Sequence, residues 1–218
     1  MGRIFNMDGP LFRNLTKMAD AFLLTLLFWL STVTVIGFGL GLTAAFTVVF
    51  KQLDECDHGV LRDFFQAVKK NFRQGIIIWL ILAVVGLVLF WDWQILPLVL
   101  TSGQVLTGGR YIILVIVLLW IMVVLYVFPL LARFDNSVSQ TMKNALLLSI
   151  RYFPYTVLLL FFSVLPVTLI VLVPQSTGFV LFLVLILWPG TWIMITAGAM
   201  KKLFQPFMPE EEKKEDEF

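Results

Sequence analysis

The feature of this sequence that most constrains its fold is a series of long runs without any charged side chain. The first run covers residues 21–50, and four more follow at 75–91, 111–132, 152–173 and 179–200. Uncharged apolar runs of about 18 residues or more are typical of transmembrane helices, because a helix satisfies its own backbone hydrogen bonds inside hydrocarbon. With 60% hydrophobic and only 14% charged residues, the sequence predicts an all-α, polytopic membrane helical bundle with five to six membrane segments arranged in hairpins.

The run at residues 21–50 is too long for one straight span. Its thirty residues would form a helix of about 45 Å, whereas the hydrocarbon core of a bilayer is about 30 Å thick. Irregular backbone at this depth has to be buried in protein or line a cavity. We therefore expect a broken helix or a tight hairpin here, with one long tilted helix as the alternative. The candidate helix break comprises Thr34, Gly37, Gly39 and Gly41.

Two polar connections, residues 51–73 and 133–151, predict amphipathic helices at the cytoplasmic membrane surface. In the first, apolar side chains recur every four residues, and charged side chains, Asp63 among them, are expected on the opposite face. A shift of 78 residues superposes this apolar stripe on that of the second connection, which suggests an internal repeat; amphipathic spacing alone is the alternative explanation. Ser137 and Gln140 offer a capping box for the second helix. The candidate face for docking a partner or the membrane comprises Val60, Phe64, Phe65, Val68, Lys69, Lys70, Phe72, Arg73, Met142 and Arg151.

The distribution of basic residues predicts the topology. Residues 51–73 contain five basic side chains and residues 133–151 contain three, whereas the loops at 92–107 and 174–178 contain none. Because basic loops stay in the cytoplasm, both amphipathic helices and the C-terminus are predicted to be cytoplasmic. The basic N-terminal segment is expected on the same side, which requires six membrane segments in three hairpins. The alternative is five spans with the N-terminus outside.

The sequence contains no catalytic signature. Cys56, Asp57 and His58 are the only place where a nucleophile, an acid and a base cluster. One Cys and one His make a poor metal site, and adjacent residues cannot easily build a triad, whose members are gathered in space. No phosphate-loop, dinucleotide or zinc-protease motif is present. We therefore predict no catalytic residue, no metal, no cofactor and no enzymatic activity.

The remaining polar residues exclude further classes. No basic stripe is interleaved with aromatic residues, which argues against nucleic acid as a partner. The apolar runs hold no ionisable residue well inside, which argues against ion-coupled transport, and their Ser and Thr hydroxyls are expected to serve helix packing. We expect one integral membrane domain at residues 1–208, in contact with the lipid bilayer, and an acidic disordered tail at residues 209–218.

Several stretches resemble the YesL family of bacterial multi-pass membrane proteins, a domain of unknown function. They are the N-terminal MGRIFNMDGPLF, the threonine-glycine break from Thr34 to Gly37, and LRDFFQAVKKNFRQGIIIWLIL. The resemblance covers nearly the whole chain apart from the acidic tail. The family often has a proline ahead of its threonine, whereas Ser31 and Thr32 stand in that area here. The resemblance implies the cell membrane of a bacterium and a role around carbohydrate uptake, because such proteins are often encoded near sugar-uptake ABC transporters and sugar-responsive two-component systems.

Two functions fit the sequence. The first is an accessory or regulatory membrane component whose amphipathic helices dock an ABC sugar transporter, a sensor kinase or the membrane surface. The alternative is a permease that transports a small solute in its own right. The absence of intramembrane charge, of an ATP-binding motif and of the Glu-Ala-Ala loop typical of ABC permeases favours the first function. The oligomeric state stays open.

Overall fold

The computed structural model describes residues 10–34, 37–56, 58–99, 103–172 and 177–207. Within these ranges the chain is helical and contains no strand, which confirms the predicted all-α class. The helices are α1 (Pro10–Thr32), α2 (Gly37–Leu53), α3 (Val60–Val99), α4 (Gly103–Arg133), α5 (Val138–Arg151), α6 (Phe153–Leu172) and α7 (Thr177–Phe204), followed by a 3-10 turn, η2 (Gln205–Phe207).

Four of the described helices, α3, α4, α6 and α7, are long and apolar enough to cross a membrane. The apolar parts of the first two helices are shorter, at Met18–Thr32 and Gly37–Leu53. Large apolar side chains are exposed along all four long helices, as expected for surfaces that contact lipid rather than water. The structure therefore has the character of a helical membrane protein, while the number of crossings stays a prediction.

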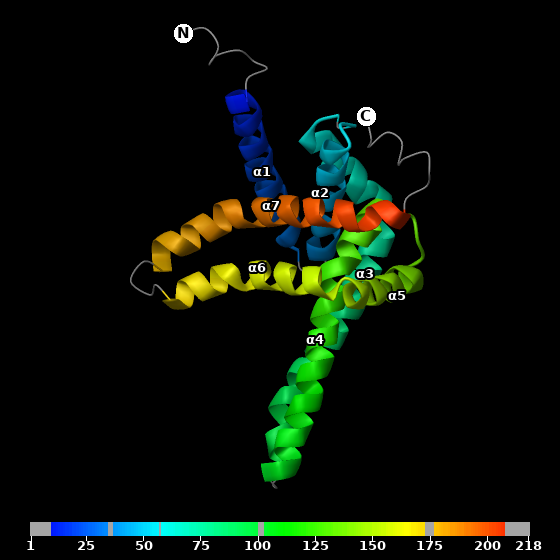
Figure 1. The fold of residues 1–218 in the computed structure, drawn as a ribbon, viewed down its shortest axis with the longest axis vertical. Helices are drawn as coiled ribbons and strands as arrows, with labels where there is room; N and C mark the ends of the chain where they lie inside the picture. Colours follow the sequence, from blue (N-terminus) through cyan, green and yellow to red (C-terminus); the bar gives the residue numbers. More distant parts are fainter. Residues whose placement is uncertain (1–9, 35–36, 57, 100–102, 173–176, 208–218) are drawn as a thin grey trace.

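The apolar run at 21–50 is divided between α1 and α2, so the single long helix is wrong. Helix α1 ends at Thr32 and α2 begins at Gly37, and the two helices run in opposite directions (Figure 1). The Ser31 and Thr32 hydroxyls both donate to the Phe28 carbonyl at 2.7 Å. These bonds let hydroxyl residues end a helix without leaving their side-chain donors unsatisfied in an apolar setting.

The glycines of the predicted break serve close packing as well as the turn. Thr34 lies in the turn and Gly37 begins α2, but Gly39 and Gly41 lie inside α2. A Cβ on Gly39 would lie 2.7 Å from the Trp79 Cβ atom of α3, and one on Gly41 would overlap the Ser31 side chain of α1. The break is therefore shorter than predicted, and the later glycines allow α2 to approach its neighbours.

Helix α3 corrects the prediction of a separate surface helix at 51–73. The amphipathic segment from Val60 and the apolar run from Gly75 form one continuous helix of 40 residues. Such a helix measures about 60 Å, twice the thickness of a hydrocarbon core, so its charged first half extends beyond the apolar run. The second amphipathic helix, α5, is separate: it ends at Arg151 and α6 begins at Phe153.

The hairpin of α3 and α4 and the hairpin of α6 and α7 point in different directions from a common body (Figure 1). Helix α2 lies within this body, and most of its residues are buried. The body also contains the fully buried side chains of Phe46, Tyr126, Phe128 and Phe204, from α2, α4 and α7. Because burial of large aromatic side chains dominates core energetics, this body fixes where the polar ends of the helices meet.

Candidate functional site: a polar junction and an exposed basic face

Charged side chains from four helices meet around the C-terminal end of α2. Lys51 Nζ lies 2.7 Å from Asp63 Oδ1 of α3, and Lys201 Nζ of α7 lies 2.9 Å from Asp54 Oδ1. Arg133, at the end of α4, also pairs with Asp54. We call these five residues the α2 junction. It ties the end of α2 to α3 and to two helices that are distant in the sequence, α4 and α7.

The junction is extended by hydrogen bonds between uncharged and charged groups. The Gln52 side chain donates to Asp20 of α1 at 3.0 Å, and Lys201 also donates to the Leu53 carbonyl at 3.0 Å. That carbonyl belongs to the last residue of α2, where helix carbonyls lack partners within the helix. A cation at this position also interacts favourably with the helix dipole.

Asp63 is fully buried, which contradicts its predicted place on the polar face of the amphipathic helix. It lies before the apolar run of α3, outside the segment that can enter the membrane. Burial raises the pKa of the Asp63 carboxyl, but a hydrogen bond from Lys51, the His58 backbone N–H at 2.8 Å and the nearby positive charges hold that pKa below its ordinary value of 3.8. Asp63 is therefore an ionised, fully paired carboxylate at neutral pH.

The predicted docking residues divide into two groups. Val60 and Phe64 are buried in the core, and Val68 and Met142 are half-buried against it. Phe65, Lys69, Lys70, Phe72, Arg73 and Arg151 are exposed. Val60 and Phe64 are therefore withdrawn from the predicted docking face, because the body of the protein itself covers them.

The exposed side of the first half of α3 is both apolar and basic. Leu61, Phe65 and Phe72 are each more than half exposed, and Arg62, Lys69 and Arg73 lie next to them on the helix surface. We call these six residues the α3 face. Lys70 is not one of them, because it pairs with Asp135 at 2.9 Å. Among the described residues, no acid pairs with Arg62, Lys69 or Arg73.

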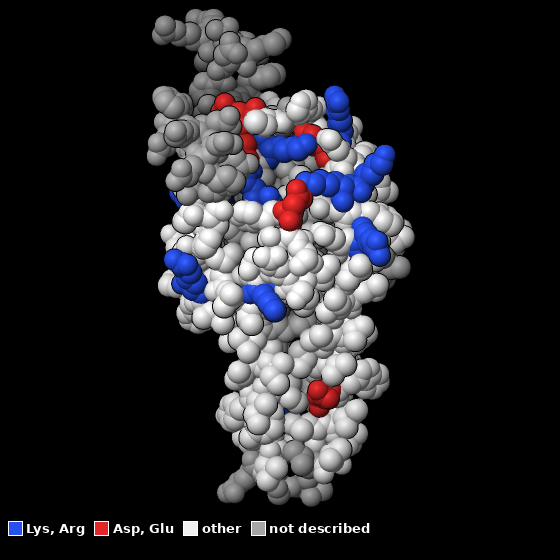
Figure 2. Space-filling view, turned by 90° about the vertical axis from the view of Figure 1, so that its right-hand side faces the viewer, with Lys and Arg blue, Asp and Glu red and all other residues white. Residues whose placement is uncertain are grey.

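Charge is distributed unevenly over the molecule. Figure 2 shows Lys and Arg side chains gathered over the upper part of one side, whereas the lower part, where α3 and α4 extend, is almost free of charge. The hairpins are therefore apolar, and the body from which they extend has a basic end. Such an end suits the side of a membrane that retains basic residues.

The apolar cavity between the hairpins is poor in polar groups. It has a volume of about 320 Å³ and is lined by side chains of α1, α2, α4, α6 and α7. Its hydroxyl, on Ser163, donates to the Leu159 carbonyl and accepts from Trp192 Nε1 at 2.8 Å. Elsewhere in the apolar runs, Thr25, Thr43, Thr168 and Thr191 donate to carbonyls one turn earlier in their own helices. These hydroxyls are satisfied by the protein itself.

The described parts of the Cys56–His58 stretch lie between α2 and α3. Cys56 is exposed and free, the His58 backbone N–H binds Asp63, and Asp57 lies outside the described residues. No group of three His, Cys, Asp or Glu side chains in the described ranges could hold a metal ion.

Sequence reasoning missed Asp20, Gln52, Asp54, Arg133 and Lys201 as partners. A signal was present, because Lys51, Arg133 and Lys201 are each the first charged residue after an apolar run. If those runs end on one side of the membrane, their terminal charges come together there.

Comparison with known proteins places the chain in a family. Residues 21–93, which include α2 and most of α3, match the family described as "Protein of unknown function, DUF624". The chain is 32% identical over 164 residues to the uncharacterized protein YteU of Bacillus subtilis (strain 168), and the match covers 72% of each chain. No solved structure matches. On this evidence the chain belongs to the DUF624 family.

Proposed function

We propose that this protein is an accessory or regulatory component of a bacterial cell membrane that works beside a carbohydrate-uptake system and docks its partner through the α3 face. The observation that carries the proposal is a helix surface with exposed aromatic side chains and with basic side chains that pair with no acid among the described residues. Phe and Arg are enriched in protein interfaces. The link to carbohydrate uptake comes from the resemblance to the YesL family. Membership of DUF624 by itself implies no such link.

The partner surface that fits the α3 face is apolar with acidic groups at its rim. Phe65 and Phe72 stand two helical turns apart and would enter apolar pockets, while Lys69 and Arg73 would meet the acidic rim. An ABC sugar transporter or a sensor kinase are the candidate partners, and the proposal assigns no enzymatic activity to this chain. A path for a sugar would need several free polar groups, whereas the hydroxyls of Thr25, Thr43, Ser163, Thr168 and Thr191 donate to carbonyls of their own helices. The Thr196 hydroxyl differs from these, because it is buried without a hydrogen-bond partner among the described residues.

The docking proposal is tested by crosslinking in cells from a photoreactive side chain at Lys69. We expect a protein adduct with a component of a sugar-uptake system, and we expect Phe65→Glu with Phe72→Glu to abolish it. Lys143→Glu, an exposed change on α5, is the matched control and should leave the adduct intact. Adducts with lipid alone would overturn docking, and sugar movement by the purified protein in liposomes would show a permease instead.

We also propose that the first half of α3 and α5 are copies of one unit. Under the shift of 78 residues, buried Asp63, Ala67 and Asn71 correspond to buried Thr141, Ala145 and Ser149. Each helix therefore places a small side chain between two buried polar ones, which amphipathic spacing alone does not require. Overpacking gives a test: Ala67→Leu and Ala145→Leu should both destabilise the protein, and tolerance of either change would contradict equivalent roles.

The topology that supports this function has the basic end and the C-terminus in the cytoplasm, with the N-terminus on the same side. The antiparallel course of α1 and α2 supports an even number of crossings before Lys51 (Figure 1). The basic residues of α3, α4, α5 and α7 near that end support its cytoplasmic position.

A further inference from the structure

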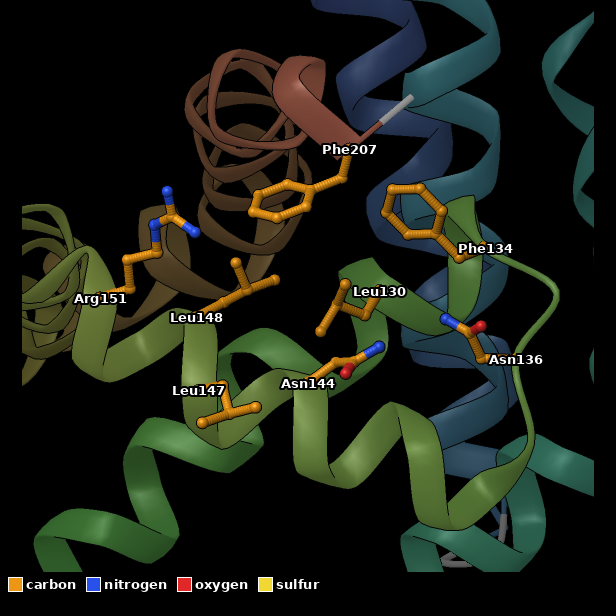
Figure 3. Close-up of a pocket in the computed structure, with 8 residues that line it drawn as sticks. All are labelled: Leu130, Phe134, Asn136, Asn144, Leu147, Leu148, Arg151 and Phe207. Carbon is orange, nitrogen blue, oxygen red and sulfur yellow. The ribbon is translucent and has the colours of Figure 1, made fainter. Parts of the chain in front are cut away.

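Arg151, at the end of α5, lies at a pocket that is separate from the α3 face. The pocket has a volume of about 370 Å³ and opens between the end of α4, helix α5 and the η2 turn (Figure 3). It is lined by Leu130, Phe134, Asn136, Asn144, Leu147, Leu148, Arg151 and Phe207.

The Arg151 guanidinium lies against two aromatic rings. Its central carbon lies 5.7 Å from the centre of the Tyr152 ring and 5.6 Å from that of Phe207. In contrast to Lys51, Lys70, Arg133 and Lys201, it pairs with no carboxylate among the residues that the structure describes. Contact with aromatic faces leaves the planar N–H fork available, and this fork matches the oxygens of a phosphate.

Two side-chain amides stand at the other end of the pocket. Figure 3 shows Asn136 and Asn144 there, with Leu130, Leu148 and the Phe207 ring between them and Arg151. Within the described part of the chain neither amide has a hydrogen-bond partner. A carboxamide both donates and accepts, so these two groups suit the hydroxyls of a ligand.

The surroundings of the pocket select an amphiphile over a soluble ligand. Leu147 lines the pocket and is 65% exposed, and Ile150 and Phe153 beside it are more than half exposed. The apolar helix α6 begins directly after Arg151 and Tyr152. A ligand with a charged head in the pocket could therefore lay hydrocarbon chains along exposed apolar side chains. Basic pockets at the end of membrane helices are known to bind anionic lipid headgroups.

We propose that this pocket binds the headgroup of an anionic phospholipid, with the phosphodiester on Arg151 and headgroup hydroxyls on Asn136 and Asn144. Phosphatidylglycerol has this combination of one negative charge and free hydroxyls. The site does not depend on the proposed docking function, since it uses different residues on different helices.

The test is native mass spectrometry of the purified full chain, titrated with dioctanoyl phosphatidylglycerol or dioctanoyl phosphatidylcholine. We expect phosphatidylglycerol to bind about tenfold more tightly, and Arg151→Gln to remove this preference, because hydrogen bonds to charged groups carry that much affinity. Lys143→Gln removes an exposed charge from the same helix and should leave the preference unchanged. Arg151→Lys keeps the charge without the fork and should bind with intermediate affinity.

A second titration separates the two ends of the pocket and the two sources of phosphate. Dioctanoyl phosphatidylethanol carries the same charge without hydroxyls, so Asn144→Leu should lower phosphatidylglycerol affinity to the phosphatidylethanol level. Equal binding by Arg151→Gln and Lys143→Gln would overturn the site. Displacement of the lipid by millimolar glycerol phosphate would also overturn it, because the ligand would then be a soluble phosphate ester.

Discussion

The carboxylate of Asp63 shows how single residues hold this protein together. It is fully buried, yet Lys51 and the His58 backbone N–H bind both its oxygens. A buried charge without partners is very costly, whereas a charge with a complete set of hydrogen bonds is tolerated and fixes the geometry around it. Asp63 therefore fixes the position of α3 against the end of α2.

We expect Asp63→Asn to lower the free energy of unfolding by about 1–3 kcal/mol at neutral pH, because the charge-assisted bonds are lost. The pKa of Asp63 is lowered by folding, so its stabilising contribution is complete above the unfolded pKa of 3.8 and is lost as the pH falls through the lower folded value. Thermal unfolding of both proteins in detergent should show a constant difference at pH 5–8 and a smaller one only in strong acid. Asp135→Asn, in an exposed pair, is the control and should have little effect. A difference that disappears by pH 5 would contradict this account.

At Gly39 the packing of α2 depends on the lack of a side chain and not on charge. A Cβ there would lie 2.7 Å from Trp79 Cβ and 2.9 Å from the Phe128 ring. We expect Gly39→Ala to lower the free energy of unfolding by about 1–3 kcal/mol through overpacking. Gly198, also helical, has no atom within 4 Å of such a Cβ, so Gly198→Ala should be neutral or slightly stabilising. Thermal unfolding of the two variants, measured side by side, tests this. A similar effect of both changes would mean that helix propensity, and not packing, determines the stability at Gly39.

At the scale of the element, α2 is held at its C-terminal end by charges from its neighbours. Asp54 pairs with both Lys201 of α7 and Arg133 of α4, and all three side chains are less than one fifth exposed. Such pairs are screened by water only weakly. Asp54 therefore links the end of α2 to both α4 and α7.

We expect Asp54→Asn to lower the free energy of unfolding by about 3 kcal/mol, because two poorly solvated cations lose their counter-charge. Lys201→Met removes one of those cations and should cost less. In a double-mutant cycle read by thermal unfolding, the two effects should couple, with the double variant more stable than the sum of both changes predicts. Additive effects would mean that Asp54 and Lys201 act independently.

The elements themselves could be predicted in large part, and their contacts could not. The apolar runs predicted the helices, and the hydroxyls and glycines near Thr34 indicated the break. Of the predicted capping box, the structure shows the Ser137 hydroxyl accepting from the Gln140 backbone N–H at the start of α5. These signals are local. Which side of α3 faces the core depends on α2, so Val60 and Phe64 were misplaced and Asp63 was predicted to be exposed. Arg151 was identified by its position, but its pocket requires Phe207, which is distant in the sequence.

At the scale of the whole molecule, the polar ends of the helices gather at one end while two apolar hairpins leave it in different directions (Figure 1). The α2 junction, the α3 face and the Arg151 pocket all belong to helix ends or to charged helix segments near this end. If it faces the cytoplasm, a partner protein and the lipids of the inner leaflet meet the same region of the protein. The orientation therefore decides whether both proposals can hold together.

Cys56 provides a direct test of that orientation, since it is the only cysteine of the sequence and is exposed beside the end of α2. We expect a membrane-impermeant maleimide to leave it unlabelled in intact cells and to label it once the membrane is opened. In a Cys56→Ser background, Thr107→Cys, near the start of α4 and exposed, should be labelled in intact cells, because it lies across the apolar run of α3. Gly2→Cys in the same background should behave like Cys56 if six segments cross the membrane, and like Thr107→Cys if only five do. Labelling of Cys56 from outside would place the basic end on the outer face, against the retention of basic residues inside, and would remove the α3 face from any cytoplasmic partner.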